Sequence, residues 1–116
     1  MGRALDRWNE LMKAWEANDF DAIEDMYTTD AVYYEPYNPP HNGNLLTVAY
    51  LKDFLGSKTD LQVNMKRVLE QEEEGRAAAE WTVSYTAAGR RWNSLPRASF
   101  IDVDEQGRIT YHRDYT

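Results

Sequence analysis

The 116-residue chain contains no cysteine and only two histidines. The lack of cysteine excludes disulfides, thiolate metal sites and thiol catalysis. A metal site would have to depend on carboxylates, and no spacing of acidic residues in the sequence indicates one. We therefore expect no metal site.

Basic residues and long apolar runs are also scarce. Thirteen Lys and Arg residues stand against twenty Asp and Glu residues, for a net charge of -7, and the sequence has no basic patch with which to bind nucleic acid. No apolar run approaches the roughly 18 residues that a membrane-crossing helix needs. These absences predict a soluble, cytoplasmic protein without nucleic-acid or membrane partners, and the length predicts one domain over residues 1–116.

Three segments have the features of helices. In the first, apolar residues recur at steps of three and four, as in an amphipathic helix. Asp21 and Glu24 have the spacing of a capping box, which predicts a short second helix. Thr47 is expected to cap a third helix, which Gly56 ends. The apolar positions of the first helix are Leu5, Trp8, Met12 and Trp15.

The rest of the chain has the alternation of β-strands. Residues 31–35 are β-branched and aromatic, which predicts a strand before a proline-rich loop. After the third helix, alternating segments near residues 61–66, 77–85, 92–103 and 108–116 predict a meander of four strands, with a positive φ at Gly107 in its last turn. Helices grouped before a run of strands predict an α+β fold.

The last nine residues, RITYHRDYT, place a carboxylic acid beside an imidazole. In a strand, Thr110, His112 and Asp114 share one face, because successive side chains alternate. This face contains the densest group of chemically capable side chains in the sequence. We therefore expect the functional site here.

Three stretches resemble the SnoaL-like branch of the nuclear transport factor 2-like superfamily. They are WNELMKAWEANDFDAIEDMYTTDAVYYEP, the segment NPPHNG followed by VAYLKDFL, and FIDVDEQGRITYHRDYT, and together they span nearly the whole chain. The resemblance implies a cone-shaped, curved antiparallel sheet wrapped around three helices. It also implies an apolar cavity for a small molecule and a homodimer formed through the outer sheet face.

The implied cone orients the alternation of the strands. Five polar residues are expected to face away from the cavity: Glu80, Thr82, Ser84, Arg97 and Arg113. Trp81, Trp92 and Phe100 are expected to shape the cavity. The residues expected to bind a ligand are Trp81, Val83, Tyr85, Ser94, Pro96 and Ala98.

The loops and the ending are most similar to limonene epoxide hydrolase. The resemblance puts the tyrosine of that family on Tyr33 and its water-holding Asp on Asp114, whereas its Asn position holds Glu35. The family's Arg-x-Asp pair is replaced by Trp-Thr-Val at residues 81–83. Epoxide hydrolysis by the same arrangement is therefore not expected.

The candidate catalytic residues are Asp114, His112, Tyr33 and Glu35. A carboxylate among apolar walls should have a raised pKa, which favours Asp114 as a general base; alternatively, Asp114 is a fully hydrogen-bonded structural residue. His112 either orients Asp114 or acts as the complementary acid, or it is a packing residue. Glu35 either forms an acid–base pair with Asp114 or lies in solvent, and Tyr33 either donates a hydrogen bond to substrate or belongs to the core.

The sequence thus predicts a small cofactor-independent enzyme that uses general-base catalysis in an apolar cavity. Its substrate would be an apolar molecule with a carbonyl, hydroxyl or epoxide group, and the reaction would be of the isomerase, cyclase, dehydratase or hydrolase type. The alternative is a non-catalytic domain for small-ligand binding or dimerisation. The missing Arg-x-Asp pair favours that alternative.

Overall fold

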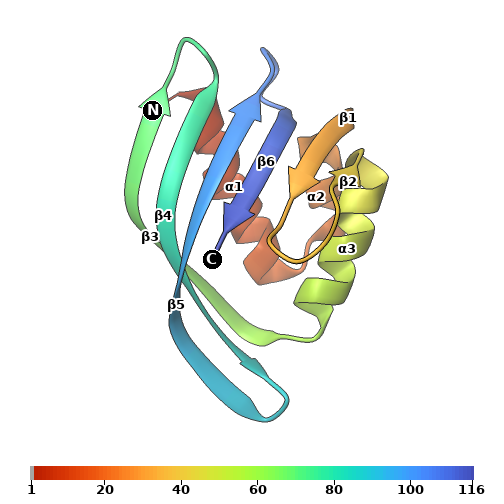
Figure 1. The fold of residues 1–116 in the computed structure, drawn as a ribbon, viewed down its shortest axis with the longest axis vertical. Coiled ribbons are helices and arrows are strands. Elements are labelled where there is room, and N and C mark those ends of the chain that lie inside the picture. Colours follow the sequence, from red (N-terminus) through yellow and green to blue (C-terminus); the bar gives the residue numbers. More distant parts are fainter. Residues whose placement is uncertain (1) are drawn as a thin grey trace.

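The computed structural model describes residues 2–116, which form three helices and one six-stranded sheet (Figure 1). The helices are α1 (Arg3–Ala17), α2 (Phe20–Met26) and α3 (Asn44–Gly56). The apolar face of α1 is buried, including Trp8 and Trp15. Three predicted helices and the predicted α+β class are confirmed.

The caps of the second and third helices differ from the prediction. The Asp19 side chain caps α2 by accepting a hydrogen bond from the Ala22 amide, so the proposed capping box that begins two residues later is wrong. Helix α3 begins before Thr47, whose buried hydroxyl donates to the Gly43 carbonyl. Gly43 has a φ of 87°, and a Cβ there would lie 2.9 Å from the Thr29 carbonyl oxygen. Only glycine fits that approach without strain.

The strands are β1 (Tyr27–Tyr34), β2 (His41–Asn42), β3 (Thr59–Gln71), β4 (Arg76–Ala87), β5 (Arg90–Val103) and β6 (Ile109–Tyr115). Their order in the sheet is β2-β1-β6-β5-β4-β3. The predicted meander of β3 to β6 is confirmed, and Gly107 has the expected positive φ in its last turn. Strands β1 and β6 pair in parallel, so the sheet is mixed rather than wholly antiparallel.

The sheet curls around the helices without closing. Strands β3, β4 and β5 are long and bent, and the helices lie on the concave side (Figure 1). Trp8 and Trp15 of α1 meet the indole of Trp81 on β4 edge to face, with ring centroids 5.8 and 5.9 Å apart. This aromatic contact joins the helical layer to the sheet at the floor of the cone.

A β-bulge in β5 reverses which residues face the helices. Tyr85 is opposite Trp92, whereas Val83 is opposite Leu95, so Ser84 has two residues opposite it. Ser94 has a φ of 52°, and its amide donates to the Ser84 hydroxyl over 2.8 Å. An extra residue shifts the alternation by one, so that odd-numbered residues beyond the bulge point inward. Ser99, Ile101 and Val103 are accordingly buried.

The predicted orientation of β5 is therefore wrong for several residues. Ser94, Pro96 and Phe100 are exposed, and Ala98 is half-buried on the outer face, so these four do not line the cavity. Trp92 instead contacts the guanidinium of Arg90, 4.1 Å from its ring centroid. Arg97, expected outside, points inward. Ser84, also expected outside, is buried at the bulge.

A second irregularity affects the last strand. Val103 is opposite Ile109 and Asp102 is opposite Tyr111, so Thr110 is the extra residue. Thr110 is exposed, and the prediction that it shares a face with His112 and Asp114 is wrong. No helix within residues 2–116 is long and apolar enough to cross a membrane.

Candidate functional site

Asp114, near the end of β6, accepts three hydrogen bonds from side chains of the sheet. Its Oδ1 accepts from the Ser99 hydroxyl at 2.6 Å and contacts His112 Nε2 at 2.7 Å. Its Oδ2 accepts from the Tyr33 hydroxyl at 2.6 Å. The strand register brings these side chains together, because Ser99 on β5 pairs with Asp114 and Tyr33 on β1 pairs with His112.

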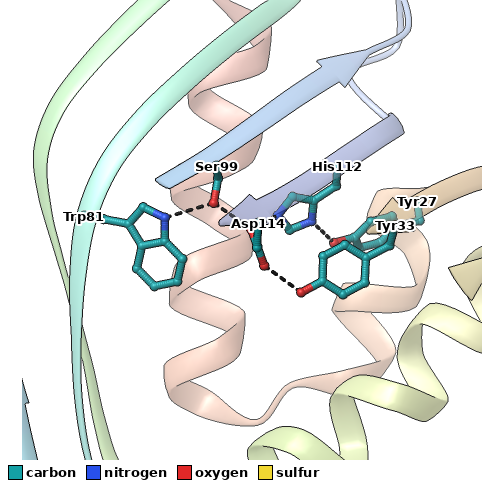
Figure 2. A network of polar contacts seen from close by, with 6 residues as sticks. All are labelled: Tyr27, Tyr33, Trp81, Ser99, His112 and Asp114. Carbon is teal, nitrogen blue, oxygen red and sulfur yellow. Dashed lines mark hydrogen bonds and ion pairs between the residues drawn. The ribbon is translucent and has the colours of Figure 1, made fainter. Parts of the chain in front are cut away.

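Two further residues extend this network (Figure 2). The Trp81 indole donates to the Ser99 hydroxyl over 2.9 Å, and the Tyr27 hydroxyl lies 2.7 Å from His112 Nδ1. Figure 2 shows Asp114 between Trp81 and Ser99 on one side and the two tyrosines on the other. His112 is 0% exposed and has a partner at each ring nitrogen. It can therefore orient Asp114 but cannot reach a substrate in this arrangement.

The pKa of Asp114 is lowered, contrary to the prediction. Burial by itself raises this pKa, but the charge of His112 and the hydrogen bonds from His112, Ser99 and Tyr33 together outweigh that effect. Asp114 is consequently a carboxylate at neutral pH. Burial and then the charge of Asp114 raise the pKa values of Tyr27 and Tyr33, so both phenols stay protonated and can donate.

The candidate site is a partly enclosed pocket on the concave side of the sheet, called the inner pocket below. Six of the predicted residues line it: Tyr33, Glu35, Trp81, Val83, Tyr85 and Asp114. Further lining residues, not predicted, include Tyr50, Phe54, Lys58 and Arg97. The walls are mainly aromatic and aliphatic, with a few polar groups that converge on the space, as in small-molecule sites.

Glu35 is a second acidic residue on the wall of the inner pocket. Its side chain is 2% exposed, and its Oε1 has no hydrogen-bond partner within the described residues. The Nε2 atom of His41 lies 3.8 Å from Oε1. Burial and the Glu35 carboxylate raise the pKa of Tyr50, which keeps that phenol protonated. Glu35 Oε1 is thus a buried hydrogen-bond acceptor on the pocket wall that no described residue occupies.

Residues 7–112 match the family model of the SnoaL-like domain, which covers most of the chain. The chain belongs to the SnoaL-like domain family. Comparison with curated protein sequences gives no significant match.

Solved structures similar to this SnoaL-like domain agree on the fold. An LEH-like epoxide hydrolase from M. tuberculosis is 23% identical with a TM-score of 0.81, and the alignment covers 97% of this chain and 81% of that one. A proposed polyketide cyclase from Xanthomonas campestris pv. campestris is 22% identical with a TM-score of 0.81, covering 98% and 90%. An NTF2-like protein of unknown function from Burkholderia pseudomallei is 15% identical with a TM-score of 0.84, covering 99% and 91%. At these identities the likeness shows the fold, and the expected superfamily is confirmed.

Sequence reasoning missed several residues of this SnoaL-like site. Arg97 was assigned to the wrong face and Ser99 was not singled out, because the bulge at Ser94 is invisible to a simple alternation count. Tyr27, the first residue of β1, was not named as a site residue. Lys58 follows α3 without any distinctive motif, and only the fold brings it to the pocket.

The site offers hydrogen bonding and proton transfer rather than metal binding. Within residues 2–116, no three His, Asp or Glu side chains are placed to hold a metal ion. The chemically active groups of the inner pocket include two carboxyl groups, four phenols and two basic side chains, set among other aromatic rings.

Proposed function

We propose that this SnoaL-like domain is a cofactor-independent enzyme that removes a proton from a small apolar molecule, or from a water beside it, with Asp114 as the base. One observation carries the proposal: an ionised carboxylate lies on the wall of the inner pocket with an acceptor position left on Oδ2. Two carboxylate oxygens offer about four acceptor positions. Three are occupied in the described chain.

The surrounding network supports this role by fixing the carboxylate. Ser99 and His112 hold Oδ1 from inside the protein, so that Oδ2 is the oxygen left for the pocket. Tyr33 donates its single O–H to Oδ2 and so fixes the orientation of that oxygen at the pocket. His112 is a positioning residue in this scheme because it does not contact the pocket.

The lowered pKa of Asp114 narrows the substrate class. A weaker base removes protons efficiently only where they are already acidic, because proton transfer depends on the match between the two pKa values. A carbon between two carbonyl groups, or a water that attacks a strained or activated carbon, meets this condition. Substrates with a simple ketone are less suited to this base.

Glu35 provides the complementary group in the proposal. Its unpartnered Oε1 and Asp114 both line the inner pocket. Oε1 can accept a hydrogen bond from a substrate hydroxyl or from the attacking water. The proton that Asp114 takes up then returns from Asp114 to the product.

The test is proton exchange in D₂O with a panel of 1,3-dicarbonyl compounds, ketones and epoxides, followed by NMR. Wild type should accelerate exchange or conversion of at least one activated compound, and Asp114→Asn should lose about 100-fold or more. Asp102→Asn, on the outer face of β5, is the matched control and should keep the wild-type rate. The proposal fails if Asp114→Asn stays within a few-fold of wild type, or if compounds that bind the pocket show no exchange.

A specific observation favours a second candidate, a non-catalytic ligand-binding domain. Asp114 accepts three hydrogen bonds and has a lowered pKa, as structural carboxylates do. Trp81 and Val83 moreover occupy the positions of the Arg-x-Asp pair of limonene epoxide hydrolase. This candidate predicts tight binding of an apolar ligand by wild type and Asp114→Asn alike, without proton exchange in either.

A further inference from the structure

Two basic side chains line the inner pocket at the end of α3 and on β5. Lys58 lies just beyond α3, and its Nζ is 3.9 Å from the centroid of the Phe54 ring and 5.1 Å from that of Tyr85. Arg97 lies on β5 and points to the same pocket. Lys58 therefore lies against aromatic rings, and Arg97 is half-buried at the same pocket.

Neither cation has an acidic partner within the described residues. Lys58 Nζ donates to the Phe54 carbonyl at 2.8 Å and contacts the Ser57 hydroxyl at 3.4 Å, whereas Arg97 donates to the Pro96 carbonyl at 2.8 Å. No ion pair joins either side chain to a carboxylate in residues 2–116.

The two cations also repel each other. Burial lowers the pKa of Lys58, and the nearby charge of Arg97 lowers it further. Like charges held together at a half-buried site are unfavourable on their own. A bound anion would remove this repulsion and satisfy the free donors of both side chains.

The position of Arg97 on β5 sets the two basic side chains apart from Asp114. Arg97 precedes Ser99, the partner of Asp114, by two residues on the same strand. Two residues of extended strand span about 7 Å. An anionic group between Lys58 and Arg97 would thus lie clear of Asp114, with the aromatic walls between them available to the apolar part of the same molecule.

We propose that the inner pocket selects apolar molecules that carry a carboxylate, which Lys58 and Arg97 bind at the end of the pocket away from Asp114. This inference names a substrate class for the proposed function. It depends on the proposed function only for the reaction at Asp114. Binding of the carboxylate is independent of any reaction. Arg97 supplies directional donors for two carboxylate oxygens, and Lys58 supplies a compact charge.

The test compares 4-phenylbutyrate with its neutral amide, 4-phenylbutanamide, in NMR titrations. Wild type should bind the carboxylate at least about tenfold more tightly than the amide, as expected for charge-assisted hydrogen bonds in a half-buried site. Lys58→Gln and Arg97→Gln should each reduce this preference several-fold. The matched control Arg76→Gln removes a cation from the outer face, where Arg76 pairs with Asp102, and should leave the preference unchanged.

A second measurement guards against variants that fold poorly. The pKa of the Lys58 amine, followed by NMR in the wild-type protein, should rise when 4-phenylbutyrate binds and stay constant with the amide. Equal affinity for both probes, no binding of the carboxylate, or an unchanged Lys58 pKa on its binding would overturn the inference. If Asp114→Asn keeps the carboxylate preference while no activated compound reacts with wild type, the binding inference stands and the proposed reaction fails.

Discussion

The side chain of Ser99 links the floor of the cone to the candidate site. Its hydroxyl accepts from the Trp81 indole and donates to Asp114, and both bonds are buried. Ser99→Ala should therefore lower the free energy of unfolding by about 1–3 kcal/mol, because it leaves buried polar groups without a partner. Urea denaturation measures the loss. Ser94→Ala, on the same strand but exposed, is the control and should cost far less; equal losses would show that the network contributes little.

Asp114 also makes the free energy of unfolding depend on pH in the acidic range. Its pKa is lowered in the folded protein, so the unfolded chain takes up this proton first as the pH falls. The stability that Asp114 contributes is complete above its ordinary pKa of 3.8 and declines as the pH falls through the lower folded value. In urea titrations from pH 6 downward, Asp114→Asn should show a smaller acid loss than wild type. Parallel curves would contradict the lowered pKa.

The bulge in β5 decides which side chains reach the pocket. Ser94 holds a φ of 52° at the bulge, a left-handed conformation that is hardest for β-branched residues. Ser94→Val should lower the free energy of unfolding by about 1–2 kcal/mol, whereas Ser94→Gly should be neutral or stabilising. Asn93→Val, at the neighbouring exposed position, is the control. A similar cost for both valine variants in thermal unfolding would argue against strain at Ser94.

Most elements were predictable from the sequence, whereas strand β2 and the two strand irregularities were not. Periodicity and turn residues indicated three helices and the meander, because these signals are local. The bulge at Ser94 depends on a hydrogen bond from its amide to Ser84 on the neighbouring strand. A single-strand count cannot detect such a contact, and one extra residue inverts every assignment beyond it.

The candidate site was predicted in part for the same reason. Asp114 and Tyr33 lie where the family resemblance placed them, on the wall of the inner pocket. The pKa of Asp114 was predicted with the wrong sign, because the prediction counted burial but not the donors. Ser99 and the charge of His112 reverse that sign, and both reach Asp114 only through the sheet register.

The outer face of the curled sheet exposes an apolar row across neighbouring strands. Leu69 pairs with Ala78, Ala78 pairs with Phe100, and Phe100 meets the ring of Tyr115 edge to face. Leu69 is 72% exposed and Phe100 is 49% exposed. Large apolar side chains grouped on a surface mark contact sites. Ion pairs flank the row, and they join Arg67 to Glu80 and Arg76 to Asp102.

We propose that this row is the contact between two copies of the chain. A two-fold axis brings the same patch of each copy together, and a patch with charges of both signs at its edges can then pair each charge with its opposite. Phe100→Glu would place a carboxylate at the centre of that contact. Light scattering should give twice the chain mass for wild type and the chain mass for Phe100→Glu.

The control for this experiment is Tyr37→Glu, because Tyr37 is the most exposed large apolar residue yet lies in the loop before β2, away from the row. It should remain dimeric. Circular dichroism should show that both variants are folded. For Phe100→Glu this is expected because Phe100 is half-exposed and its replacement leaves the core intact. A dimeric, folded Phe100→Glu would exclude the row as the interface. A monomeric wild type across the concentration range would exclude the dimer itself.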